Sequence, residues 1–117
     1  MNQEQLKKRT KEFAKQIIRI CRQLPETREG RLIGNQLFRS GTSVGSNYRS
    51  CCRARSKADF VAKAGLVLEE TDETLYWLEL LLEVDVMEKK SLEPAIKEAN
   101  ELVAIFVATL NKAKERK

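Results

Sequence analysis

The spacing of apolar residues constrains the fold of this chain more than any other feature, because it alternates between three and four over long segments. The first such stripe is Leu6, Thr10, Phe13, Ile17, Ile20 and Leu24. An α-helix has 3.6 residues per turn, so this spacing places the side chains on one helical face. Pro25 follows at once and cannot continue a helix. The pattern predicts an amphipathic helix that ends at this proline.

Two later segments repeat the same alternation. One stripe is Phe60, Ala64, Val67, Thr71, Leu75, Leu78 and Leu82, and the other is Leu92, Ile96, Ala99, Val103, Phe106, Leu110 and Ala113. Ser56 and Asp59 have the spacing of a capping box, which predicts that a helix opens there. Ser91 is the expected N-cap of the last helix, with Pro94 in the first turn, where its missing N–H costs little.

The segment between the first and third stripes is ambiguous. Residues 40–47 read SGTSVGSN, and each glycine costs a helix roughly 1 kcal/mol relative to alanine, which favours a loop. A helical phase nevertheless persists across it, through Leu37, Val44, Tyr48, Cys51 and Arg55. Small residues also let two helix backbones approach closely. We therefore predict a continuous or kinked helix from about Arg28 to Arg55, with a loop as the alternative.

Four helices with short connections predict an all-α, antiparallel up-down-up-down four-helix bundle. The chain has 117 residues with only 5 Gly and 2 Pro, which fits one ordered helical domain over residues 1–117. No apolar run is long enough to span a membrane, and the first residues lack the apolar middle of a signal peptide. We expect a soluble, cytoplasmic protein without a membrane partner.

Charge is segregated along the chain. Residues 1–63 hold 15 Lys and Arg against 5 Asp and Glu, a net charge of +10, whereas residues 64–117 hold 7 against 12, a net charge of −5. Such a separation favours a surface that meets RNA, DNA or an acidic partner over a pocket for a small-molecule substrate. The candidate nucleic-acid-binding residues are Arg39, Tyr48, Arg49, Arg53, Arg55, Lys57 and Lys63.

The arginines and lysines of this set would contact phosphates, and Tyr48 would stack on a base or sugar. The sequence has no helix-turn-helix, RRM or KH signature, so binding directed at the nucleic-acid backbone is expected. The same arginines support an alternative, a protein scaffold in which they pair with acids of a neighbouring helix or subunit. Those acids are Glu69, Glu70, Asp72, Glu73 and Glu79.

The third helix has more apolar residues than one inward face can hold. The surplus residues are Tyr76, Trp77, Leu80, Leu81 and Val84. They cannot all lie under a single stripe of about 100°. Burial between subunits of a homo-oligomer would cover them, and a well-covered central helix within one chain is the alternative.

The sequence gives little support for a catalytic site or a metal site. The chain has no histidine, the commonest acid/base catalyst and metal ligand. Glu69 shares a helix face with Asp72 and Glu73, but di-iron bundles also require Glu-x-x-His. We expect no enzyme activity, no metal and no cofactor. Cys21, Cys51 and Cys52 have no CxxC spacing and are expected to be reduced thiols in or near the core.

The run RSGTSVGSNYRSCCRARSKADF, followed by EETDETLYWLELL, closely resembles a family of bacterial four-helix-bundle proteins first noticed in intervening sequences of large-subunit ribosomal RNA genes. The chain is also similar in architecture to the accessory variability determinant of diversity-generating retroelements. The resemblance implies an antiparallel bundle that assembles into a barrel-like homopentamer without known catalytic activity. It also implies nucleic acid, or a reverse transcriptase with its RNA, as the candidate partner. Where the family often has Ser-Ile-Pro-Ala-Asn, this chain has SVGSN at residues 43–47.

Overall fold

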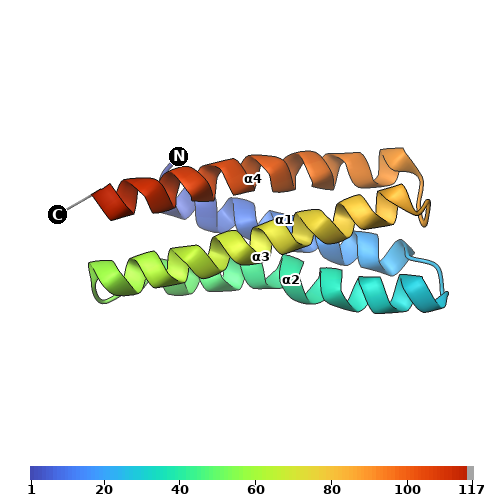
Figure 1. Cartoon of the computed structure of the whole chain (residues 1–117), viewed down its shortest axis with the longest axis horizontal. Coiled ribbons are helices and arrows are strands. Elements are labelled where there is room, and N and C mark those ends of the chain that lie inside the picture. Colours follow the sequence, from blue (N-terminus) through green and yellow to red (C-terminus); the bar gives the residue numbers. More distant parts are fainter. Residues whose placement is uncertain (116–117) are drawn as a thin grey trace.

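The computed structural model of the protein describes residues 1–115, which form four α-helices packed side by side (Figure 1). The helices are α1 (Gln3–Gln23), α2 (Arg28–Cys52), α3 (Lys57–Glu83) and α4 (Lys89–Glu115). Short turns join consecutive helices at alternate ends of a rod that measures 49 × 20 × 19 Å. The prediction of an all-α four-helix bundle is confirmed for the described residues.

Side-chain caps fix the starts of α1, α2 and α3. The Asn2 side chain accepts a hydrogen bond from the Gln5 backbone N–H at 2.8 Å, and the Gln5 side chain accepts one from the Asn2 N–H at 3.0 Å. Thr27 caps α2 in a similar way. The Ser56 hydroxyl accepts from the Asp59 N–H at 3.1 Å, which confirms the predicted start of α3. Each cap satisfies a backbone N–H that has no partner within its helix.

The start of α4 differs from the prediction. The helix begins at Lys89, so Ser91 lies inside the first turn and is not the N-cap. The Ser91 backbone N–H already donates to the Glu88 carbonyl at 3.0 Å, and the helix starts three residues earlier than predicted. Pro94 is consequently the sixth residue of α4 and lies in its second turn.

Helix α2 is continuous through residues 40–47, as predicted. It ends at Cys52 with Arg53 as the C-cap, three residues before the predicted end at Arg55. The small residues have a clear packing role on the side of α2 that meets α1. A Cβ added at Gly41 would lie 2.7 Å from a side-chain atom of Ile17. The two helices can therefore pack this closely only because residue 41 has no side chain.

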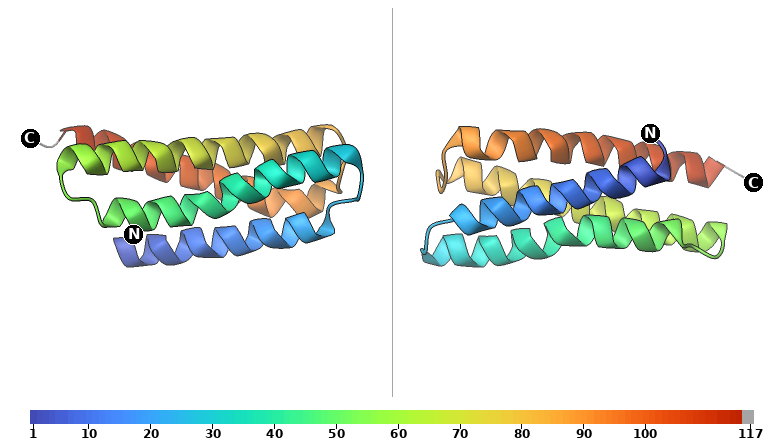
Figure 2. Two further views of the ribbon diagram at one scale, coloured as in Figure 1. Left: turned by 90° about the horizontal axis from the view of Figure 1, so that it is seen from below. Right: turned by 180° about the vertical axis from the view of Figure 1, so that it is seen from behind.

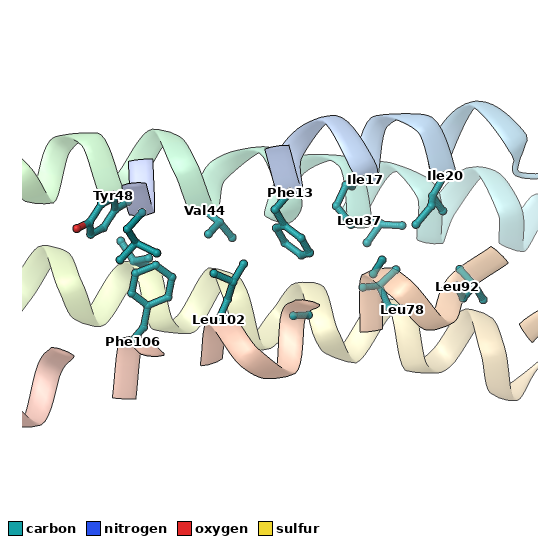
Figure 3. Close-up of a cluster of buried hydrophobic side chains, with 14 of the residues drawn as sticks. Phe13, Ile17, Ile20, Leu37, Val44, Tyr48, Leu78, Leu92, Leu102 and Phe106 are labelled. Atoms are coloured by element: carbon teal, nitrogen blue, oxygen red, sulfur yellow. The ribbon is translucent and has the colours of Figure 1, made fainter. Parts of the chain in front are cut away.

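The core runs along the bundle and largely follows the predicted stripes (Figure 3). The stripe of α4 differs from the prediction, because Ala95 and Leu102 are fully buried and Val103 does not belong to the core. Its largest fully buried side chains include Phe13, Ile17, Leu37, Leu78, Leu102 and Phe106. A buried hydroxyl pair crosses between two helices, since the Thr74 hydroxyl lies 2.9 Å from that of Ser40. In the described part of the chain, every buried side-chain nitrogen and oxygen has a hydrogen-bond partner. Burial of these polar side chains therefore leaves no hydrogen-bonding group without a partner among the described residues.

Candidate polyanion-binding groove

Helices α1 and α2 run side by side along the rod (Figure 2). Two adjoining hollows share Ser46 and Arg49: the first lies between α1 and α2, and the second continues it along α2 alone. The first has a volume of about 170 Å³ and the second about 290 Å³. We call them together the basic groove. From α1 it is lined by Lys7, Lys11 and Ala14. From α2 and its C-cap residue Arg53 it is lined by Thr42, Gly45, Ser46, Arg49, Ser50 and Arg53.

Glycine at position 45 lets the helices meet at the floor of the basic groove. A Cβ there would lie 3.3 Å from the backbone of Thr10, closer than most Cβ contacts. The longer cationic side chains flank this floor from both helices. The seam therefore combines a narrow floor of small residues with positively charged walls, a shape that suits an extended anion.

The cations of the basic groove have few acidic neighbours. Lys7 pairs with Glu4 of its own helix at 2.7 Å. Within residues 1–115, the side chains of Lys11, Arg49 and Arg53 make no ion pair. No acidic residue lines either hollow. The charges of Lys11, Arg49 and Arg53 are therefore not neutralised by ion pairs within the described residues.

The seam between α1 and α4 is different because acids and bases are matched there. Arg9 of α1 contacts Glu98 at 2.6 Å and Glu101 at 3.1 Å, both on α4. The hydrogen bond to Glu98 raises the pKa of Arg9 above its ordinary value. Desolvation of the guanidinium acts in the opposite direction but is the smaller effect. This arginine is occupied within the fold and is not available to a ligand.

Arg39 is also occupied within the fold. Its guanidinium pairs with Glu70 at 3.3 Å and with Glu73, so it belongs to the seam between α2 and α3. The Glu73 carboxylate also accepts a hydrogen bond from the Trp77 indole N–H at 2.9 Å. The alternative prediction, that arginines pair with acids of the third helix, thus applies to Arg39 within a single chain. This residue lies outside the basic groove.

Tyr48 does not lie where the prediction requires it. Its side chain is only 5% exposed and points into the bundle beside Phe106, with ring centroids 5.6 Å apart (Figure 3). Burial also raises the pKa of its phenol above the ordinary value. The prediction that Tyr48 stacks on a base is therefore wrong. The physical reason was visible in the sequence, because Tyr48 follows Val44 at the helical spacing of the core stripe.

The remaining candidates gather around the turn between α2 and α3. Arg55 and Lys57 are exposed, and the Lys57 ammonium lies 3.5 Å from the carbonyl of Lys114. Lys63 pairs with Asp59 at 3.2 Å. A hydrogen bond from the Arg55 backbone N–H, and a second from Lys63, lower the pKa of Asp59. These cations extend the positive surface beyond the groove without lining it.

The structure also divides the surplus apolar residues of α3. Tyr76 and Val84 are 56% and 51% exposed, Trp77 and Leu80 are half-buried, and Leu81 is fully buried in the core of the chain. The prediction of Leu81 as an interface residue is therefore wrong, since its helical position faces the bundle. Leu66, which is 52% exposed, joins the exposed stripe and was not predicted. We call Leu66, Tyr76, Trp77, Leu80 and Val84 the α3 outer face.

No other site chemistry is evident in the described part of the chain. Residues 1–115 contain no group of three or more metal-binding side chains, and none of their helices is long and apolar enough to cross a membrane. Burial raises the pKa of the Cys21 and Cys51 thiols to about 11, and Cys51 is buried in the core. Both thiols are therefore protonated at neutral pH and poorly nucleophilic.

The fold and its core place this chain among the all-α four-helix-bundle proteins. Residues 2–108 match the model of the 23S rRNA-intervening sequence protein family, and the chain belongs to that family. The resemblance predicted from the sequence is confirmed. The chain is also similar to a solved structure from Bacteroides thetaiotaomicron, described as a protein with unknown function from the S23 ribosomal protein family. The sequence identity is 31%, the TM-score is 0.86, and the match covers 95% of this chain and 99% of that one. A search of curated proteins found no match.

Proposed function

We propose that this protein is a non-enzymatic, cytoplasmic helical bundle that binds the phosphate backbone of RNA or DNA through the basic groove. The observation that carries the proposal is a set of three cations without ion-pair partners in residues 1–115, Lys11, Arg49 and Arg53, which line the basic groove together with no acid. Lysine and arginine beside hydroxyls are the usual phosphate contacts of proteins, and they carry no sequence information. A nucleic acid, alone or held by a reverse transcriptase, is the partner this chemistry fits.

The proposal includes self-association through the α3 outer face. An up-down-up-down bundle assembled into a barrel-like homopentamer would bury these apolar side chains and repeat the basic groove on every subunit. Repetition would strengthen binding by avidity, since a second groove engages a strand already held by the first.

A second candidate function is a protein scaffold with no nucleic-acid role. The exposed aromatic pair of the α3 outer face favours it, because Tyr76 and Trp77 pack edge to face with ring centroids 5.0 Å apart. Aromatic residues are enriched in the buried centres of protein interfaces. In this function, Arg49 and Arg53 would pair with acids of a neighbouring subunit.

The experiment that separates the two functions replaces Arg49 and Arg53 together by glutamate. Both side chains are exposed, and neither makes an ion pair within residues 1–115, so the helix content should not change. Binding of a labelled RNA is followed by fluorescence anisotropy at several salt concentrations, and the mass by light scattering. We expect loss of binding, or a slope of log affinity against log salt that is shallower by about 2, at unchanged mass.

A matched control reverses two other exposed charges. Lys97 and Lys112 are exposed residues of α4 outside the basic groove, and neither makes an ion pair within residues 1–115. Their replacement by glutamate changes the net charge equally. This control should keep most of the affinity. Loss of the oligomer in the Arg49 and Arg53 variant would support the scaffold. Unchanged mass and unchanged binding would refute both functions.

A further inference from the structure

A third hollow continues the same seam beyond the basic groove. It has a volume of about 230 Å³ and lies between the end of α1 and the first turns of α2. Leu24, Pro25 and Gly34 contribute to its lining, together with Arg31, Asn35 and Phe38. The Phe38 side chain is 47% exposed although it is large and apolar. We call this site the Phe38 hollow.

The Phe38 hollow lies in line with the basic groove. At about 100° per residue, positions 38, 42, 49 and 53 lie within about 60° of one another around the axis of α2. Residues 38 and 49 are separated by about 16 Å along that axis, at about 1.5 Å per residue. This length accommodates up to about five nucleotides of a stacked strand at about 3.4 Å each. One strand could therefore reach both sites.

The two sites differ in the ligand chemistry that they favour. The basic groove is lined by cations and hydroxyls and by no acid, whereas Glu26 lines the Phe38 hollow. Because Glu26 and Arg31 both line it, the hollow has no net positive charge and suits the backbone of a strand less well than the basic groove does. The half-exposed Phe38 ring shares the hollow with Asn35 and with Arg31, whose guanidinium donates to the Glu26 carbonyl at 3.4 Å. An accessible aromatic face beside polar side chains suits a nucleobase, which stacks on the ring and bonds through its edges.

We propose that the seam between α1 and α2 binds single-stranded nucleic acid, with Phe38 stacking on one unpaired base while Lys11, Arg49 and Arg53 contact phosphates. A paired base has its faces covered by its neighbours in the duplex, so only an unpaired base can enter the Phe38 hollow. This inference rests on the proposed function and makes it more specific. It also assigns to Phe38 the stacking role that Tyr48 cannot perform.

The test compares four labelled probes with the full chain: a single strand of about 12 nucleotides, its duplex, an abasic strand of the same length, and inorganic polyphosphate. The variant is Phe38→Ala, with Phe38→Trp to restore an aromatic ring. Val107→Ala is the matched control, because Val107 is an exposed apolar residue of α4, 41% exposed. Circular dichroism is used to check that all variants keep their helix content.

We expect Phe38→Ala to weaken binding of the single strand by about 5- to 100-fold, as for loss of one stacked base. Binding of the abasic strand, the duplex and polyphosphate should change by less than about twofold, since these probes offer no accessible base face. Phe38→Trp should restore the affinity, and Val107→Ala should leave it unchanged.

The possible failures are distinguishable. If the wild-type protein binds none of the four probes, both the proposed function and this inference are overturned. If it binds them but Phe38→Ala has no effect, or weakens the abasic and normal strands equally, only the inference is overturned. A loss of single-strand affinity that Phe38→Trp does not restore also overturns it, because stacking requires only an aromatic face.

Discussion

Replacing Gly41 by alanine tests whether α1 and α2 pack as closely as the structure indicates. The added Cβ would meet three side-chain atoms of Ile17 at 2.7, 2.8 and 3.0 Å, and Ile17 is fully buried. Branching at the Cβ restricts the rotamers of isoleucine, so this neighbour cannot move aside easily. Gly65 provides the matched control, because it lies within α3 and a Cβ there has no neighbour within 4 Å.

Both substitutions improve helix propensity, but only Gly41→Ala adds a side chain where there is no space for it. Alanine is more favourable than glycine inside a helix by about 1 kcal/mol, so Gly65→Ala should raise the free energy of unfolding by roughly that amount. Gly41→Ala has the same gain but overpacks the seam, at a cost of about 1–3 kcal/mol. We therefore expect Gly41→Ala to be less stable than Gly65→Ala by about 1–3 kcal/mol, and less stable than the wild type by up to about 2 kcal/mol.

Urea unfolding followed by circular dichroism measures both variants. The protein concentration must be the same throughout, since self-association would make the apparent stability depend on it. A shift of the midpoint at constant slope assigns the effect to stability. Equal stabilisation by the two substitutions would refute the close packing of α1 and α2 at position 41.

Two further predictions concern self-association and pH. Wild-type protein should scatter light as about five times the 13.4 kDa chain, and Tyr76→Glu should reduce the mass at unchanged helix content. Val107→Glu is its control, and a wild-type monomer would contradict the expectation. The folded state holds the Cys21 and Cys51 protons more tightly, with pKa values of about 11 instead of 9.0. The unfolding free energy should therefore be highest below about pH 9 and fall towards pH 11. In a variant with both cysteines replaced by alanine, it should fall less steeply over this range.

The fold was predictable because the apolar residues recur at the period of an α-helix. This spacing involves only residues close together in the sequence. Continuity of α2 was predictable for the same reason, although Gly41 and Gly45 weaken its helix propensity. The start of α4 was not, because Ser91 has the right side chain for a cap but Glu88 accepts the first helical hydrogen bond. Caps depend on local backbone geometry that residue type alone leaves undetermined.

The candidate site was predictable only in part, because it combines two helices. Arg49 and Arg53 were identified from their charge, whereas Lys7 and Lys11 join them only through the packing of α1 against α2. The signal that could have found the lysines is the position of Gly45, which marks where α1 must cross closely. Charge alone also could not separate Arg39, which neighbouring acids neutralise, from arginines that remain unpaired.

The hydroxyl pair in the core also determines how the second and third helices align. Ser40 lies opposite Thr74, and its other contact, to the carbonyl of Leu37, is long at 3.4 Å. If α3 slid by one helical turn so that Leu78 faced Ser40, the Ser40 hydroxyl would be left without a good partner, at a cost of about 1–3 kcal/mol. Leucine and valine accept many neighbours of similar size, so they discriminate weakly between such alignments. The hydroxyl pair therefore opposes this slip, and with it a displacement of the cations of α2 relative to the acids of α3.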